Sequence, residues 1–254
     1  MYGGRGFGSR NKNMIKKGCI YYTDFSANPE ILNACQKQLR KSFDGEIISV
    51  SLNKPLNFGK NIVLKANGGV VTMFRQILLG LETSTADIVF FTENDVLYHK
   101  SHFDFEPLRD DTFYYNTNIF QLKYPEDFAI TYDTIKSLSG LCVNRKLAIE
   151  HYKKRLQFIK DNNFKDDSKQ PYWARRIGWE PGTKSKRQEM ISHDKSECWK
   201  SEYSNIDIRH KNTLTPVKMS LDKFKHKPKG WKIIKASQIP GWNLKEIINI
   251  KVYE

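Results

Sequence analysis

Two acidic residues, Glu93 and Asp95, stand two positions apart directly after the apolar run IVFFT at 88–92. In extended chain, side chains two positions apart point the same way, so both carboxylates are expected to face one place. Like charges held together repel, and oxygen-ligated Mn²⁺ or Mg²⁺ relieves that repulsion. The spacing predicts a divalent metal that could bridge nucleotide phosphates. An ordinary pair of surface carboxylates is an equally good interpretation of the spacing alone.

The elements that must position these acids follow from the pattern of the first half. The runs CIYYT (19–23), EIISVSL (46–52) and ADIVFFT (86–92) have the composition of strands, and the last is too apolar to have a solvated face. Apolar residues recur at helical spacing after Pro29 and again over 70–81. Strands alternating with helices predict an α/β fold with a mostly parallel central sheet flanked by helices.

Ligands in such sheets bind beyond the carboxyl ends of the strands. Three segments are therefore candidate binding elements. They are Thr23-Asp24, the loop around Asn57, Phe58 and Gly59, and Glu93-Asn94-Asp95.

The pattern is weaker after Asp95. TFYYNTNIFQL (112–122) is expected to form one strand, and a helix is expected to open at Ser139-Gly140 and run through NRKLAIEHYKKRLQFIK (144–160), with His151 packed in the core. NIDIRH (205–210) predicts a short strand with Ile206, Ile208 and His210 on one side. The lysine-rich end, from residue 223 to 243, is expected to be irregular chain.

We expect a flexible, basic and glycine-rich tail at 1–17, a single domain at 18–235 and a C-terminal extension at 236–254. Within the domain, 18–105 would hold a nucleotide and 106–235 an acceptor. The net charge of +14 lies almost wholly in the second half: residues 1–150 carry 18 Lys and Arg against 16 Asp and Glu, and residues 151–235 carry 22 against 10. This excess predicts a polyanionic partner, with a solvated basic surface as the alternative.

The four cysteines are far apart and form no CxxC pair, which argues against structural zinc and for a reducing compartment. No apolar run is long enough to cross a membrane, and the first residues do not form a secretory signal. A cytoplasmic protein is expected, in the host cytoplasm if the chain is viral. The oligomeric state does not follow from the sequence.

The first half resembles the GT-A glycosyltransferases, a Rossmann-like class with an Asp-X-Asp metal motif. YYTD (21–24) is similar to the first strand with its nucleotide-binding end, and FFTENDVLYH (90–99) is similar to the Asp-X-Asp strand and loop, with Glu in place of the first Asp. The resemblance implies Asp95 as a direct metal ligand. It implies that Glu93 contacts the ribose, a metal-bound water or the metal itself.

The second half resembles inverting, galactosyltransferase-like members of that class, of phage or bacterial type. GWEPG (178–182) is similar to their Gly-Glu-Asp element and IDIRH (206–210) to their Ile-Arg-His element. Carried over, Glu180 becomes the general base and His210 a further metal ligand. GWEPG lacks the second acid of the usual pair, so Glu197 is a second candidate base.

The resemblance also implies a nucleotide-sugar donor, with UDP-sugar expected. Asp24 would contact the uracil or ribose, Thr23 and Asn94 would lie beside it, and Arg75 or Gln76 would reach the nucleotide. Ser139 and Gly140 would lie under the sugar. His99 and His102 are expected to be loop or acceptor-side histidines. Tryptophans 173, 179 and 199, among basic residues, are candidate platforms for bases or sugars.

Together these features predict a metal-dependent glycosyltransferase whose acceptor is a hydroxymethylated pyrimidine in phage-type modified DNA. Three alternatives remain open at this point. The acceptor could be a surface polysaccharide or lipid-linked glycan, the protein could bind nucleic acid without catalysis, or it could transfer a nucleotidyl group.

Overall fold

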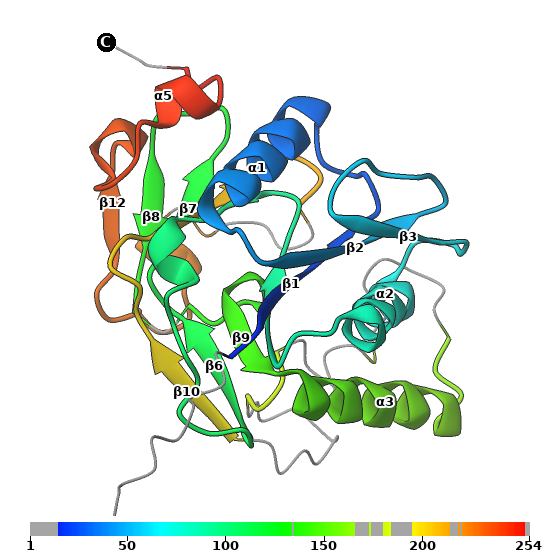
Figure 1. Ribbon diagram of the computed structural model, residues 1–254. Coiled ribbons are helices and arrows are strands. Elements are labelled where there is room, and N and C mark those ends of the chain that lie inside the picture. The colour runs from blue at the N-terminus through cyan, green and yellow to red at the C-terminus, as the bar shows by residue number, and fades with distance from the viewer. Residues whose placement is uncertain are drawn as a thin grey trace, which may run out of the picture.

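In the computed structural model, the described residues are 15–133, 135–165, 173, 180–183, 195–213, 218 and 220–251. A seven-stranded sheet forms the centre of the molecule, in the order β10-β6-β9-β4-β1-β2-β3 (Figure 1). Its strands are β1 (Lys17–Thr23), β2 (Glu46–Leu52), β3 (Lys60–Leu64), β4 (Ile88–Thr92), β6 (Thr112–Asn116), β9 (Leu141–Asn144) and β10 (Lys195–Trp199). All neighbours pair in parallel except β9, which runs antiparallel to β4 and β6.

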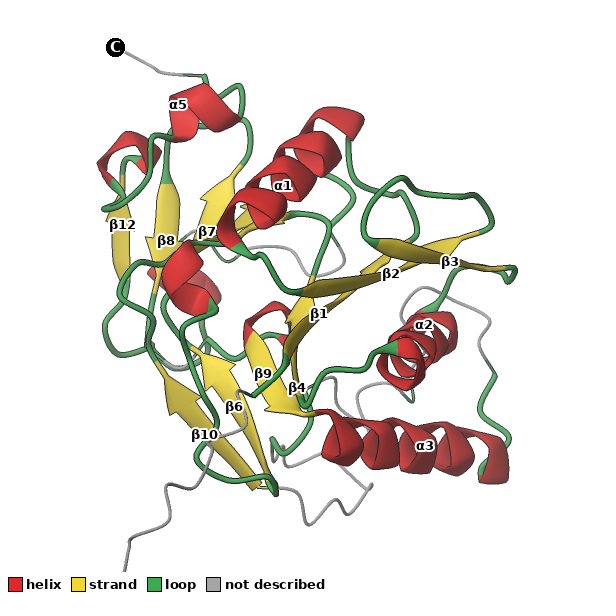
Figure 2. Cartoon of the chain, viewed as in Figure 1, coloured by secondary structure: helices red, strands yellow, loops and turns green. Residues whose placement is uncertain are grey.

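Three helices flank this sheet, as Figure 2 shows: α1 (Pro29–Ser42), α2 (Val70–Thr83) and α3 (Arg145–Asp161). Alternate residues of β1 explain the two layers, since Ile20 packs with α2 and α3 whereas Cys19 and Tyr21 pack towards α1. Both faces of the sheet are covered, so its central strands are apolar on both sides. The predicted α/β fold with a mostly parallel sheet flanked by helices is confirmed.

A second, five-stranded sheet was not predicted. Its order is β12-β8-β7-β11-β5, with β5 (Val96–Leu97), β7 (Ile119–Lys123), β8 (Ala129–Thr131), β11 (Asn205–Arg209) and β12 (Lys232–Ile234). The C-terminal segment, with the short helix α5 (Leu244–Ile247), packs its apolar side chains against α1 and this sheet in one core cluster. Residues 236–250 are therefore part of the folded body.

Several expected boundaries differ from the structure. The expected single strand 112–122 is two strands in different sheets, because the chain turns at Thr117 and Asn118 between β6 and β7. The expected helix at Ser139-Gly140 begins only at Arg145, after a 3₁₀ turn and β9, where Asn144 caps it by accepting from Lys146 N. Lys17, expected in the tail, opens β1, and residues 1–14 lie outside the described chain.

Within the described residues, no helix combines the length and apolarity needed to cross a membrane. His151 is 3% exposed, which confirms its expected place in the core.

Candidate active site

A cavity of about 520 Å³ opens where β1, β4 and β11 end. It gathers many of the side chains that the sequence predicted, although they come from five separate stretches of the chain. Those that line it are Thr23, Asp24, Gln76, Glu93, Asn94, Asp95, Glu180 and His210.

The acidic segment after β4 is held by hydrogen bonds with two tyrosines, one a donor and the other an acceptor. Tyr22 Oη donates to Glu93 Oε1 at 2.6 Å, and the backbone N–H of Glu93 donates to Tyr98 Oη at 3.0 Å. Asn94 Nδ2 donates to Thr23 Oγ1 at 2.7 Å, which ties the end of β4 to the end of β1. Glu93 and Asn94 therefore have their orientations fixed by the fold.

Asp95 and His210 meet at this cavity. Their elements are joined because Ile208 N donates to Asp95 O at 2.8 Å, next to the β5–β11 pairing. His210 Nε2 lies 3.5 Å from Asp95 Oδ2, and the side chains are 8% and 16% exposed. On the other side of the ring, His210 Nδ1 accepts from Asn212 N at 3.3 Å.

Several acidic side chains are crowded together at the cavity. Burial raises the pKa of Glu93 to about 8, with a further contribution from Asp95. Burial also raises the pKa of Asp207 to about 6, although Arg209 opposes the rise. Arg209 is paired with Asp207, and although burial opposes its charge, the surrounding carboxylates raise its pKa. These shifts indicate a site where a further cation would be electrostatically favoured.

The ligand set fits a metal ion that a substrate completes. Among the described residues, no group of three or more His, Cys, Asp or Glu side chains could by itself hold an ion. Asp95 and His210 supply two ligands, and Mg²⁺-type ions are commonly held by one or two protein groups together with substrate phosphates. Ligation through His210 Nε2 needs the neutral tautomer that carries its proton on Nδ1. A protonated Nδ1 cannot accept a hydrogen bond, so the bond from Asn212 N would be lost when a metal binds.

Sequence reasoning missed Asp207 and Arg209, which line the cavity. We expected His210 to share a side of the strand with Ile206 and Ile208. Instead Ile206 and Ile208 are fully buried in the core, and the alternate residues Asp207 and Arg209 reach the cavity. The alternation in NIDIR carried this signal, because a charged pair at alternate positions opposite two isoleucines marks the second face of a strand.

Six predicted site residues are not brought to the cavity. Asn57 and Gly59 lie between β2 and β3, and β3 begins beside Ile48, so this loop is at the amino-terminal side of the sheet. The missed strand β3 is the cause, since the chain must cross back to start a further parallel strand. The positive φ of Gly59 and its approach to the Ile47 carbonyl give that glycine a structural role.

Arg75 is exposed on α2, and its neighbour Gln76 faces the cavity instead. Ser139 and Gly140 are buried in the turn before β9, and the preceding Ser137 and Leu138 line the cavity in their place. Helix α2 was expected correctly, and Gln76 was the stated alternative to Arg75. Ser139 and Gly140 were expected to open a helix, but they lie in a 3₁₀ turn before β9, and the residues just before them line the cavity.

Glu197, the second candidate base, lies on β10 in an ion pair with Arg109 and does not line the cavity. Edge strand β10 was not predicted, so the sequence did not show that Glu197 lies away from the cavity. Glu180 does line the cavity.

The two histidines after the acidic segment are structural in different ways. His102 is fully buried, where its Nδ1 accepts from Asn116 and Asn205 at 3.0 and 3.1 Å. His99 Nδ1 accepts from Ser101 N at 3.2 Å, capping a 3₁₀ turn. Neither lines the cavity. Trp173 is buried and Trp199 stacks on Phe105, so both belong to packing, whereas Trp179 lies outside the described residues.

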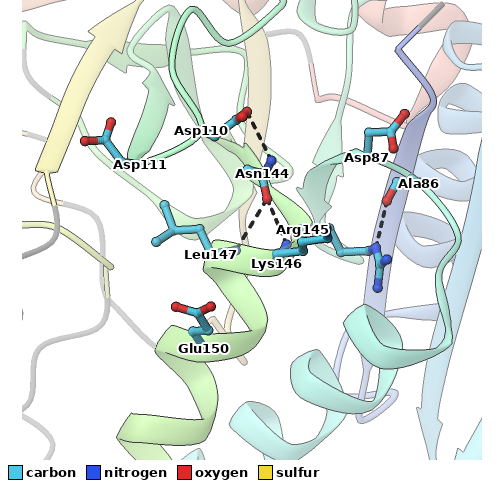
Figure 3. Close-up of a pocket in the computed structure, with 9 residues that line it drawn as sticks. All are labelled: Ala86, Asp87, Asp110, Asp111, Asn144, Arg145, Lys146, Leu147 and Glu150. Atoms are coloured by element: carbon cyan, nitrogen blue, oxygen red, sulfur yellow. Dashed lines mark hydrogen bonds between the residues drawn. The ribbon is translucent and has the colours of Figure 1, made fainter. Parts of the chain in front are cut away.

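A second cavity, of about 440 Å³, lies at the amino-terminal end of α3 and is drawn in Figure 3. Asp110 Oδ1 accepts from Asn144 Nδ2 there, and Arg145 donates to the carbonyl of Ala86. Asp87 lies just before β4, whereas Glu93 lies just after it, so this cavity is at the other edge of the sheet. None of the predicted site residues lines it.

No family model matches this sequence, and no curated protein matches it. Among solved structures, the chain is similar to TarS 1–349 of S. aureus in complex with UDP, at 14% identity and a TM-score of 0.35, covering 59% of this chain and 49% of that one. It is also similar to the apo form of the glycosyltransferase GlyE of Streptococcus pneumoniae, at 13% identity and a TM-score of 0.37, covering 72% and 45%. The chain thus spans about half the length of both proteins.

Proposed function

We propose that this protein is a metal-dependent glycosyltransferase that moves a sugar from a UDP-sugar to an acceptor hydroxyl with inversion. The observation that carries the proposal is the meeting of Asp95 and His210, 3.5 Å apart, at a cavity crowded with carboxylates. Two residues from distant parts of the chain, each singled out by resemblance to GT-A enzymes, are brought within reach of one ion.

In the proposed mechanism Asp95 and His210 would hold Mn²⁺ or Mg²⁺ together with the donor diphosphate. When bound, such an ion stabilises negative charge on the leaving diphosphate. Arg209 supplies a second positive charge at the same cavity, and its ion pair with Asp207 positions the guanidinium. Glu93, fixed by Tyr22, and Asp24, at the end of β1, contact the ribose or base.

Glu180 is proposed as the general base. It takes the proton of the acceptor hydroxyl while the acceptor oxygen bonds to the anomeric carbon of the sugar. The bond from that carbon to the diphosphate oxygen breaks, and its electron pair leaves with UDP. Attack opposite the leaving group inverts the anomeric centre.

The acceptor we propose is a hydroxymethylated pyrimidine in DNA. The basic excess of the second half supports a polyanionic acceptor, since residues 151–235 carry 22 basic against 10 acidic residues. A flipped or exposed base would present its hydroxyl to Glu180 in the cavity.

A thermal-shift assay with UDP, with and without Mn²⁺, tests the donor site. A ligand that binds only the folded state raises the melting temperature, so UDP with Mn²⁺ is expected to raise it and UDP alone to raise it less. Asp95→Asn is expected to abolish the Mn²⁺-dependent part of the rise in melting temperature. The matched control is Asp110→Asn, at the other cavity (Figure 3), which is expected to leave it intact. An equal shift in Asp95→Asn would refute the metal site.

A further inference from the structure

A lysine segment, defined here as residues 218 and 220–235, forms a strongly basic surface. It contains a single acid, Asp222, and seven exposed lysines: Lys218, Lys223, Lys225, Lys227, Lys229, Lys232 and Lys235. None of the seven forms an ion pair with a described residue, whereas Lys17, Lys153 and Lys195 elsewhere are paired with acids. The segment therefore carries positive charge that the rest of the described chain does not neutralise.

This segment is anchored beside the candidate active site. Strand β12 pairs with β8, and Asp133 N donates to Lys229 O at 2.9 Å. The Phe224 ring packs edge-on against Tyr132 with centroids 5.3 Å apart, and Lys218 Nζ lies 5.0 Å from the centroid of Phe224.

Tyr132 connects this surface to the cavity. Strands β8 and β11 lie on either side of β7, so Tyr132, directly after β8, belongs to the same sheet as the cavity residues Asp207 and Arg209 of β11. Four residues beyond Asp133, Ser137 lines the cavity. Strand pairing through β7, and the ring contact of Tyr132 with Phe224, thus connect the sheet that carries Asp207 and Arg209 to the lysine segment.

We propose that the lysine segment binds the phosphodiester backbone of duplex DNA while the adjoining cavity receives the modified base. This inference rests on the proposed function and assigns the surface that holds its acceptor. Unpaired lysines suit the backbone of DNA, because each ammonium group is a compact positive charge and the negative phosphates repeat along the polymer. Since the segment lies beside the cavity, it would contact nucleotides flanking the reacting one.

The shape of the segment favours DNA over an anionic membrane surface. Membrane-surface segments present an apolar helical face with exposed large side chains. Here the only helical turn spans Leu221–Lys223, and Phe224 and Trp231 are partly covered by the body. Ile233 is the one large apolar side chain of the segment that is strongly exposed, at 48%.

The test measures binding of a fluorescently labelled DNA duplex by anisotropy over a range of salt concentrations. The variant is Lys225→Ala/Lys227→Ala/Lys229→Ala. Each phosphate contact contributes about 0.9 to the slope of log K against log salt, so the variant is expected to lose about 2 to 3 from that slope. Lys37→Ala/Lys41→Ala/Lys60→Ala, on α1 and β3, is the control with the same change in charge and is expected to keep a slope close to that of the wild type.

Two further measurements make each outcome decisive. A triple Lys→Arg variant at 225, 227 and 229 is expected to keep the slope, which separates charge from misfolding. Loss of slope in both alanine triples alike would overturn the assignment, because the effect would then be one of net charge. Binding to phosphatidylserine vesicles that the alanine triple loses, with DNA binding unchanged, would overturn it in favour of a membrane.

The UDP thermal shift, taken on the same proteins, separates this inference from the proposed function. The lysines lie outside the cavity, so the shift with UDP and Mn²⁺ is expected to be the same in wild type and alanine triple. If the wild type binds DNA through the lysines but shows no UDP shift, the surface stands and the glycosyltransferase proposal fails. If UDP binds and DNA does not, the surface assignment fails alone.

Discussion

At the scale of single residues, the two neighbouring tyrosines of β1 have different partners. Tyr22 Oη donates to Glu93 in the cavity, whereas Tyr21 Oη accepts from Gln36 on the other face of the sheet. Tyr22→Phe removes the donor to a buried carboxyl group, which is expected to cost about 1–3 kcal/mol of unfolding free energy in urea titrations. It is also expected to weaken binding of UDP with Mn²⁺, because Glu93 loses its orientation.

Tyr21→Phe is the matched control, since it removes one hydroxyl from the same strand. It is expected to lower stability without changing UDP binding. If both variants weakened UDP binding equally, Tyr22 would have no particular role at the cavity.

Two glutamates that the sequence left as rival bases can be separated by kinetics. Glu180 lines the cavity, and Glu197 is paired with Arg109 on edge strand β10. Glu180→Gln is expected to lower the rate of sugar transfer to hydroxymethylated DNA by about 10²–10⁴-fold, the usual contribution of a general base. UDP binding should persist, because the proposed base acts on the acceptor and not on the donor.

Glu197→Gln is expected to leave that rate unchanged. A large loss of activity in Glu197→Gln with none in Glu180→Gln would reverse the assignment.

At the scale of elements, the sequence predicted those whose periodicity is long and regular. β1, α1, β2, α2 and β4 were expected because apolar residues recur with a clear period over each. β3 was read as loop, since KNIVL is short and follows a run of polar and turn residues. β5, with two residues, and β8 and β12, with three each, are too short to show any period. Apart from the local β7–β8 pairing, the second sheet is held by pairing between distant segments, which no local pattern encodes.

In the candidate site too, the sequence predicted what depends on local pattern and missed what depends on pairing between distant segments. Thr23, Asp24, Glu93 and Asp95 were expected together because parallel strands end at one edge of a sheet. The meeting with His210 came only from resemblance, because the β5–β11 pairing that creates it is non-local. Asn57 and Gly59 were misplaced by the missing strand.

Helix α2 offers a test of how an element supports the site. Gln76 is 3% exposed and its Nε2 donates to the carbonyls of Thr23 and Val50 at 3.0 and 2.9 Å, at the carboxyl ends of β1 and β2. Gln76→Met is expected to cost about 1–3 kcal/mol, measured by urea unfolding, since both buried carbonyls lose this donor. Arg75→Met, one residue earlier on the exposed face, is expected to change stability by less than about 0.5 kcal/mol. Equal losses of unfolding free energy in the two variants would show that the Gln76 hydrogen bonds do not stabilise the ends of β1 and β2.

At the scale of the whole molecule, one buried histidine joins parts of both sheets. His102 packs edge-on against Phe90 of β4 and stacks on Trp199 of β10. Its Nδ1 accepts from Asn116 of β6 and Asn205 of β11. Protonation would replace an acceptor with a donor facing two amide groups, so the folded protein keeps this ring neutral.

Stability is therefore expected to depend on pH through His102. Burial lowers its pKa to about 3, against about 6.5 in the unfolded chain. Between these values the unfolded state binds the extra proton, so this contribution is fully present above pH 6.5 and is lost progressively as the pH falls towards 3. Urea unfolding at pH 7 and pH 5 measures it, with His102→Gln as the comparison because glutamine can still accept from both amides. The variant is expected to lose less unfolding free energy between pH 7 and pH 5 than the wild type. An identical loss in both would show that His102 does not contribute to the pH dependence of stability.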